Sequence, residues 1–164
     1  MRWFNDNSEK LSHLSSITTA IVAVVALCVA IAQILAANKT QREATAQDTY
    51  REYLKLALEH PLFASGEADC KGKCEDPQAS YDWFVSYFLH SAEQVFLVYP
   101  KDAGWCKALA NRLCFHRQYL LQDQYQKVLR FHYAKPFQRL VDEATKACPK
   151  GPPPAEALKF CDLP

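Results

Sequence analysis

The amino-acid sequence predicts an all-α protein in which one N-terminal transmembrane helix continues into a stalk, followed by a bundle of four or five helices. Two observations support this fold class. An uncharged apolar run covers residues 17–37, and the chain beyond it repeats apolar residues at helical spacing without sustained two-residue alternation. The length of 164 residues predicts one domain rather than two.

Composition excludes several classes of protein. Hydrophobic residues make up 49% of the chain and charged residues 23%, which is too apolar for a disordered protein. A formal charge of +1 is too small for a general nucleic-acid binder. Four glycines in the whole chain argue against glycine-rich phosphate loops and turn-dense β architectures.

The apolar run at residues 17–37 predicts a transmembrane helix. Between Lys10 and Lys39 no residue carries a formal charge if His13 is neutral. A helix of this length spans about 30 Å, which matches the hydrocarbon core of a bilayer. We therefore expect a single-pass membrane protein with a short polar tail at residues 1–16.

Two alternatives exist for this segment. Ala30-Ile31-Ala32 has the small-x-small form of a signal-peptide cleavage site. Against it, the apolar run is longer than a signal h-region, and the preceding tail has two acids offsetting two bases. The other alternative is a buried soluble helix, although few such helices extend this far without a charge.

One face of the predicted membrane helix has the spacing of a helix-packing seam. Its members recur at intervals of four and three residues, and they are Thr19, Ala23, Ala26, Ala30, Gln33 and Ala37. Small side chains allow close backbone approach in lipid, and the single glutamine can hydrogen-bond across the interface. Because alanine is common in any membrane helix, chance alignment is the alternative.

After the membrane segment, residues 38–61 predict a helical stalk. Neither glycine nor proline occurs between Leu14 and Pro61, and the segment is rich in strong helix formers. Pro61 disfavours helical geometry at the preceding residue, so the helix should stop there. The soluble domain then covers residues 62–147 and includes a loop at 64–79.

A helix expected from Tyr81 to Tyr99, capped by Ser80, is apolar on two faces. Its core stripe consists of Tyr81, Phe84, Val85, Phe88, Ala92, Val95, Phe96 and Tyr99. A helix that is apolar nearly all round is central or has a partner on its second face. The predicted partner-binding face on that second side consists of Trp83, Tyr87 and Leu97.

Later helices complete the predicted bundle. Asp102 should cap a helix from about Ala103 to Leu121, and a last helix has Pro136 in its first turn and ends near Ala147. A further helical stretch lies between them. The Pro-rich tail at residues 148–164 is expected to be irregular.

Three sequence stretches carry a resemblance to a protein group. The stalk QREATAQDTYREYLKLALEHP, the segment YDWFVSYF and a Trp-led helix ending HRQYL resemble uncharacterised bacterial single-pass inner-membrane proteins with a small helical domain. The resemblance covers roughly residues 17–145. It implies location in the cell inner membrane and no particular activity, since the domain of that group has no known function. For some members it implies a role in phage defence or membrane stress.

The cysteines divide into two sets. Cys28 lies in the predicted span, and Cys106 and Cys114 lie within a helix, where a free cysteine behaves as a small buried hydrophobe. The other four lie in polar segments that contain glycine or proline, and they are Cys70, Cys74, Cys148 and Cys161.

Three interpretations of those four cysteines remain. Disulfides, such as Cys148–Cys161 or Cys70–Cys148, would require an oxidising compartment. A zinc site would use the C-x3-C pair Cys70 and Cys74, together with a folded-back tail. Unpaired surface thiols are the third possibility. We therefore expect these four residues to form a disulfide set or a metal site if they have a role.

No catalytic motif is present. The five histidines show no HExxH pattern, no serine lies in a nucleophile elbow, and no C-x-x-C-H haem motif occurs. We expect no cofactor and no catalytic residues, and a non-enzymatic role is favoured.

Charge is unevenly distributed along the chain. Residues 40–100 hold ten acids and five bases, whereas residues 101–139 hold eight bases and two acids. The late helices are therefore candidates for contact with anionic lipid headgroups or an acidic partner. The alternative is that acidic and basic helices neutralise each other within the domain.

Bases near the span slightly favour a cytoplasmic domain. Those before the span are Arg2 and Lys10 together with the amino terminus, and those after it are Lys39, Arg42, Arg51 and Lys55. The loop cysteines favour the periplasmic alternative. We expect the cytoplasmic side.

These observations predict a membrane-anchored helical interaction module, acting as an accessory or oligomeric subunit of a membrane complex. Its partners would be the membrane and another protein or further copies of the chain, not nucleic acid. One alternative is a membrane-tethered enzyme with a thiol or metal centre at the loop cysteines. Another is a bacterial defence effector whose helices perturb the membrane.

Overall fold

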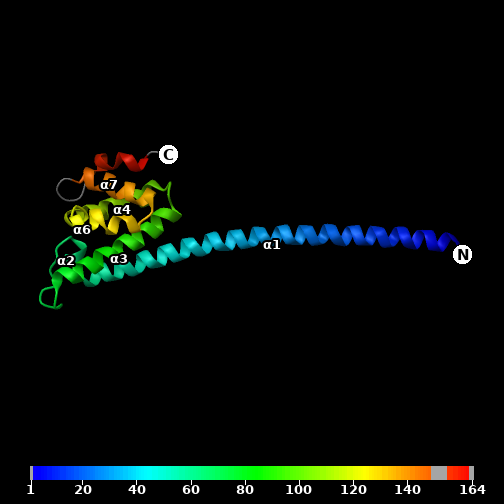
Figure 1. The fold of residues 1–164 in the computed structure, drawn as a ribbon, viewed down its shortest axis with the longest axis horizontal. Coiled ribbons are helices and arrows are strands. Elements are labelled where there is room, and N and C mark those ends of the chain that lie inside the picture. Colours follow the sequence, from blue (N-terminus) through cyan, green and yellow to red (C-terminus); the bar gives the residue numbers. More distant parts are fainter. Residues whose placement is uncertain (1, 149–154, 163–164) are drawn as a thin grey trace. The chain divides into compact units, whose positions relative to one another are not determined.

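A computed structural model describes the backbone of residues 2–148 and 155–162, and within them every regular element is a helix (Figure 1). The side chains described are those of Thr19, 21–148 and 158–162. The elements are α1 Arg2–Glu59, α2 Pro61–Ala64, α3 Pro77–Val98, α4 Ala103–Phe115, α5 Arg117–Leu120, α6 Asp123–Lys127, η1 Leu129–His132, α7 Lys135–Ala147 and η2 Ala155–Asp162. The chain divides into two compact units, residues 1–42 and residues 43–164.

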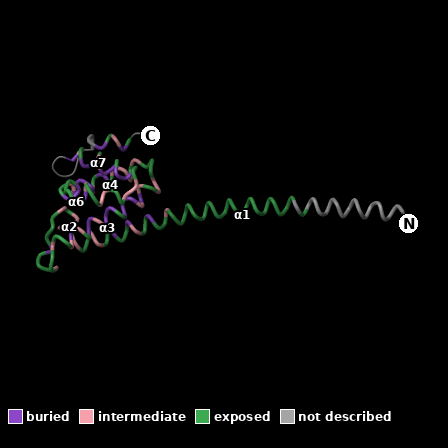
Figure 2. The backbone as a smooth tube through the Cα atoms, in the orientation of Figure 1, coloured by how far each residue is buried: buried purple, intermediate pink, exposed green. Residues whose placement is uncertain are grey.

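The first unit holds the N-terminal part of α1, which includes the apolar run. From Ile21 onward α1 contains a window of mean hydropathy 2.5 with no buried residue, and the helix is long enough to cross a membrane. All six residues of the predicted seam are exposed in this unit (Figure 2). The large apolar side chains of the same unit, such as Ile21 and Leu35, are also exposed, which is unfavourable in water and suits a surface that faces lipid.

The end of α1 belongs to the second unit. Ala46, Tyr50 and Tyr53 are buried, so one face of the segment expected to be a stalk packs into the domain core. Helix α1 ends at Glu59, two residues before Pro61, as expected because a proline disfavours helical geometry in the residue that precedes it. The domain therefore begins near residue 43, well before the expected boundary at residue 62.

Helix α3 is the central helix of the domain. It begins at Pro77 rather than after Ser80, because the Asp76 carboxylate accepts a hydrogen bond from the Ala79 amide at 2.9 Å and acts as the N-cap. Most of the predicted core stripe is buried, with Phe84, Val85 and Phe88 at 3% exposure or less. This face anchors the helix and fixes the direction of the opposite one.

Helices α4 and α7 pack against α3 and against each other. Asp102 caps α4 by accepting a hydrogen bond from the Trp105 amide at 2.9 Å, as expected. The helix expected to continue to Leu121 breaks at His116, which has non-helical backbone angles. Helix α7 ends at Ala147, in agreement with the sequence, and packs against α4.

Two disulfides tie the end of the chain to α4. They are Cys106–Cys161 and Cys114–Cys148. The expectations of a Cys148–Cys161 or Cys70–Cys148 bond, and of free thiols within α4, are therefore corrected. Residues 155–162 form η2 instead of an irregular segment, because Leu158 and Cys161 are buried against the core. Covalent attachment fixes a segment that lacks helical periodicity in its sequence.

Candidate functional site

A stripe of apolar, aromatic and polar residues runs along α3, and all of its members are exposed except the half-buried Gln94. Its members lie at intervals of four, three, four and three residues on one helical face, and they are Trp83, Tyr87, His90, Gln94 and Leu97. We call this surface the α3 stripe. The side chain of Trp83 is 78% exposed and that of Leu97 is 45% exposed. The three residues predicted to form a partner-binding face all lie on it.

A cavity of about 570 Å³ opens beside the Trp83 end of the α3 stripe. Its walls come from the end of α1, from α2, from the loop before α3 and from α3 itself. We call it the α3 pocket, and its lining residues are Leu56, His60, Phe63, Cys70, Lys73, Cys74, Ser80, Trp83, Phe84, Ser86, Tyr87 and His90. Its volume lies within the usual range of ligand pockets.

The floor of the α3 pocket is a cluster of packed rings. The Phe63 and Phe84 ring centroids lie 5.8 Å apart, Phe84 lies 5.7 Å from Tyr53, and His60 stacks on Phe63 at 5.4 Å. Burial raises the pKa of Tyr53, with the neighbouring Tyr50 as a second cause, so its hydroxyl stays neutral in the core. Such interlocked aromatic side chains give the pocket a preformed floor.

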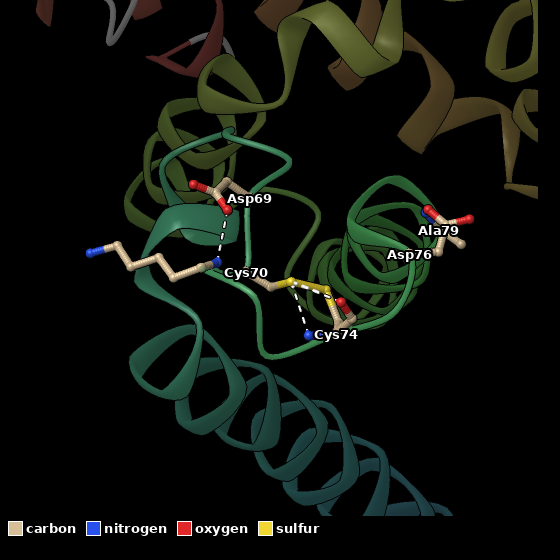
Figure 3. Close-up of a disulfide and its surroundings, with 6 residues drawn as sticks. Asp69, Cys70, Cys74, Asp76 and Ala79 are labelled. Atoms are coloured by element: carbon tan, nitrogen blue, oxygen red, sulfur yellow. Dashed lines mark hydrogen bonds between the residues drawn. A yellow bond between two sulfur atoms is a disulfide. The ribbon is translucent and has the colours of Figure 1, made fainter.

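The wall opposite α3 is a loop closed by a third disulfide, Cys70–Cys74 (Figure 3). The Lys73 amide donates a hydrogen bond to the Cys70 carbonyl at 3.0 Å, across Lys71 and Gly72 with φ of 51° and 76°. Positive φ at both central residues defines a type I′ turn, which glycine accommodates without strain. The turn brings the two sulfur atoms together.

Two further contacts hold this loop. The Asp69 carboxylate accepts a hydrogen bond from the Lys71 amide at 2.7 Å, which supports the left-handed geometry of that lysine (Figure 3). Gly66 has a φ of 90°, and a Cβ there would collide with the carbonyl oxygen of Phe115 at the end of α4. The loop is therefore fixed at its base by a close backbone approach and at its tip by the disulfide.

The charge of the α3 pocket differs from that of the loop that borders it. The loop carries four acids, Glu67, Asp69, Glu75 and Asp76, and none of them is among the described lining residues. Lys73 is the one lining residue with a formal charge, and the imidazoles of His60 and His90 add polar groups. The pocket is thus apolar with a single cationic group at its wall.

The structure does not bring the four loop cysteines together. Cys70 and Cys74 bond to each other, whereas Cys148 and Cys161 each bond to a cysteine of α4. Among the residues whose positions are described, no cluster of His, Cys, Asp or Glu could hold a metal ion. The four residues are therefore distributed over three separate disulfides.

Several bases of the late helices pair with acids inside the domain. Arg130 lies 2.5 Å from Asp142, and Lys107 lies 2.5 Å from Asp162. Both pairs join segments distant in sequence, and the Arg130 pair is the less exposed of the two. Part of the charge asymmetry along the chain is therefore compensated by packing rather than presented to an anionic surface.

A scan against protein-family models, a search of curated proteins and a search of solved structures find no match to this chain. The site is therefore defined by its own geometry. Sequence reasoning identified Trp83 and Tyr87 but missed the pocket walls contributed by Leu56, His60 and Phe63. The only signal for these three was their place on either side of the break at Pro61, which turns the chain back toward α3.

Proposed function

We propose that this chain is a membrane-anchored interaction module that binds a protein partner through the α3 stripe and the α3 pocket. The observation that carries this proposal is the 78% exposure of Trp83 on a helix whose opposite face is buried from Tyr81 to Val95. Large exposed aromatic residues beside an apolar cavity are typical of interaction sites on soluble surfaces. The apolar N-terminal helix supplies the anchor.

The energetics favour an occupied surface. Tryptophan is among the residues most enriched at binding hot spots, where it packs into a desolvated pocket on the partner. Tyr87 and Leu97 extend the same surface along α3 and remain exposed. Burying such side chains on a partner removes apolar area from water, at about 25 cal/mol per Å² before the cost of association.

We also propose that the domain lies on the oxidising side of the membrane. Six of the seven cysteines meet in three pairs, and Cys28 in the span is the remaining one. Disulfides persist in oxidising compartments and are rare in the cytosol. This proposal reverses the expectation from the bases near the span, which rested on an excess of one charge.

The membrane helix contributes to assembly in this proposal. Gln33 and the alanines of the predicted seam share one face of α1. In lipid, close backbone approach and an interhelical hydrogen bond stabilise helix association. The anchor then pairs with a second copy or with a partner subunit, while the α3 stripe supplies the contact outside the bilayer.

The interaction function is tested by the native mass of complexes extracted from membranes in mild detergent. Trp83→Ala should shift the chain from a larger complex to a smaller species. Leu121→Ala is the matched control, because Leu121 is also an exposed apolar residue, at 49%, outside the α3 stripe. An unchanged complex in the Trp83 variant would refute the proposed function.

Sidedness has a separate test. Intact spheroplasts are treated with reductant and then with a membrane-impermeant maleimide, and labelling of Cys70 and Cys74 is read by mass shift. Labelling that requires reductant and occurs in sealed cells supports the oxidising side. Labelling without reductant, and only after lysis, would place the domain in the cytoplasm.

A further inference from the structure

We propose that Cys70 and Cys74 form a thiol–disulfide exchange site, which oxidises a polypeptide dithiol that carries a large apolar side chain beside its cysteine. The α3 pocket receives that side chain. Both cysteines line the pocket, the two differ in exposure, and a backbone amide donates a hydrogen bond to one of the two sulfur atoms. This activity goes beyond partner binding and is measured without the native complex, so it can fail while the interaction function stands.

The Cys70–Cys74 bond is the disulfide that reaches the α3 pocket. Both of its cysteines line the pocket, together with the rings of Phe63 and Trp83. None of the four cysteines in the other two disulfides is among the described lining residues. A substrate thiol whose neighbouring side chain enters the pocket therefore lies beside this bond, and the apolar rings favour a large apolar side chain at that place.

The two cysteines are unequally exposed. Cys70 belongs to the core and is 9% exposed, whereas Cys74 is half-buried. The rate of thiol–disulfide exchange depends on which sulfur is attacked and on access to that sulfur. Cys74 is therefore the residue that an incoming thiolate attacks, and the Cys70 thiolate is the leaving group.

A hydrogen-bond donor for the leaving group is already in place. The Cys74 amide donates a hydrogen bond to Cys70 Sγ at 3.1 Å, whereas the Cys74 carbonyl oxygen lies farther from that sulfur, at 3.7 Å (Figure 3). A hydrogen bond to the charged form of a thiol lowers its pKa, and a thiol of lower pKa leaves faster. The formal charges of the loop have both signs, and the residues that carry them are Lys71, Lys73, Glu67, Asp69, Glu75 and Asp76. The amide is therefore the specific group that stabilises the Cys70 thiolate.

The loop has contacts that do not depend on the sulfur–sulfur bond. The Lys73 amide donates a hydrogen bond to the Cys70 carbonyl at 3.0 Å, and the Asp69 carboxylate accepts one from the Lys71 amide at 2.7 Å. Cys70 and its partner have Cα atoms 6.0 Å apart, within the range that a disulfide spans. With the turn held in this way, the reduced cysteines stay placed to form the bond again.

The exchange balances in two steps. A substrate thiolate attacks Cys74 Sγ, the Cys70–Cys74 bond breaks, and its electron pair leaves on Cys70 Sγ, which gives a mixed disulfide on Cys74. The second substrate thiolate then attacks the substrate sulfur of that mixed disulfide and releases the Cys74 thiolate. The substrate loses two electrons and two protons and becomes a disulfide, and the two cysteines gain both. A low-molecular-weight disulfide restores the bond by the reverse steps.

The test uses the full chain in nanodiscs of zwitterionic lipid, with Cys28→Ala in every sample to remove the unpaired thiol. The probes are two synthetic peptide dithiols, one with phenylalanine and one with serine beside each cysteine. Samples are quenched with acid at set times, alkylated and analysed by peptide mass mapping, which reports each disulfide separately. Cys106–Cys161 is the matched internal control, because it also joins a half-buried cysteine to a buried one but lies outside the pocket lining.

We expect the phenylalanine peptide to exchange with Cys70–Cys74 at least roughly tenfold faster than with Cys106–Cys161, because the first bond lies at the pocket. The serine peptide should react more slowly, and Trp83→Ala should reduce the difference between the two peptides. Leu121→Ala changes an exposed apolar residue outside the pocket lining and should leave that difference unchanged.

Single-cysteine variants test the roles of the two sulfur atoms. With oxidised glutathione, Cys70→Ser should form a mixed disulfide on Cys74 roughly tenfold faster than Cys74→Ser forms one on Cys70, because Cys74 is the more exposed residue. Circular dichroism melts check the folding of each variant.

Equal exchange rates for the two disulfides would show that Cys70–Cys74 is only a structural link, and this result would overturn the activity. That comparison is made within one chain, so it holds even where a Trp83 or single-cysteine variant does not fold. Equal rates for the two peptides would overturn the assigned substrate class. Faster formation of the mixed disulfide on Cys70 would overturn the assigned roles of the two cysteines.

Discussion

The hydroxyl of Tyr81 lies 2.9 Å from Nδ1 of His116, which follows it by 35 residues. His116 is fully buried at the break between α4 and α5, and its ring contacts Phe84 and Phe88 at centroid distances of 5.9 and 5.2 Å. Burial raises the pKa of Tyr81, so its hydroxyl stays neutral, and which of the two groups donates in this bond is set by the tautomer of His116. This bond joins α3 to the turn after α4.

Stability should fall with acidity because of His116. Burial, with a smaller contribution from Arg112, lowers the pKa of His116 to about 4. Between pH 6.5 and 4 the unfolded chain therefore binds more protons than the folded chain. The free energy of unfolding should keep its full value above pH 6.5 and fall by roughly 3 kcal/mol as the pH is lowered to 4. Urea unfolding at several pH values measures the slope.

The control for this pH effect is a pair of histidine variants. His116→Leu should flatten the dependence on pH between 6.5 and 4, whatever it does to stability at neutral pH. His132→Gln changes an exposed histidine and should leave the slope unchanged. An identical slope in the His116 variant and the unsubstituted chain would show that another group causes the acid sensitivity.

The two faces of α3 should respond differently to truncation. Phe88→Ala removes a fully buried ring and should lower the free energy of unfolding by roughly 3–5 kcal/mol. Trp83→Ala removes an exposed ring and should change it by no more than about 0.5 kcal/mol while weakening partner binding. Thermal melts beside native mass analysis separate the two effects. Unfolding of the Trp83 variant would mean that both faces are core.

The three disulfides should contribute unequally. Cys106–Cys161 closes a long loop, and replacing both cysteines by alanine should cost about 4 kcal/mol by loop entropy. The Cys70–Cys74 bond closes a very short loop, so the same replacement should cost about 2 kcal/mol. The second variant should nevertheless weaken partner binding more, because it alters a wall of the α3 pocket. Denaturant unfolding and native mass analysis together provide the comparison.

The membrane seam predicts a small effect from Gln33→Leu. Insertion should be preserved, and helix association should weaken by about 0.6 kcal/mol, the average for one such hydrogen bond in a membrane. Combining it with Ala26→Ile should add a steric penalty on the same face of α1. Cross-linking yields in membranes measure association, and unchanged yields in the double variant would show that this face of α1 does not pack against another helix.

Local rules predicted much of the domain. The stop before Pro61, the Asp102 cap and the end of α7 at Ala147 follow from neighbours in sequence. The buried stripe that contains Phe88 follows from helical periodicity, because one face of a central helix must meet the core. The face that contains Trp83 was predicted because the same helix is also apolar on the side opposite its core stripe.

Other features depend on contacts between distant segments. The pairing of Cys106 with Cys161 requires η2 to return to α4, which no local pattern in the Pro-rich tail indicates. The α3 pocket depends on the turn at Pro61 and on the loop held near Phe115 by Gly66. Because Tyr53 is buried, the domain includes part of the segment that was expected to be a stalk. The sequence shows that this helix is amphipathic, but it does not show which other segment covers its apolar face.

In the proposed function, the exposed face of α3 contacts a protein partner in the native membrane. It is tested most directly by placing a photo-reactive phenylalanine analogue at positions 83, 87, 90, 94 and 97 in turn, with 121 and 128 as exposed controls. We expect a discrete adduct with another protein at the α3 positions and none at the controls. Adducts of equal yield at all seven positions, or none along α3, would contradict it.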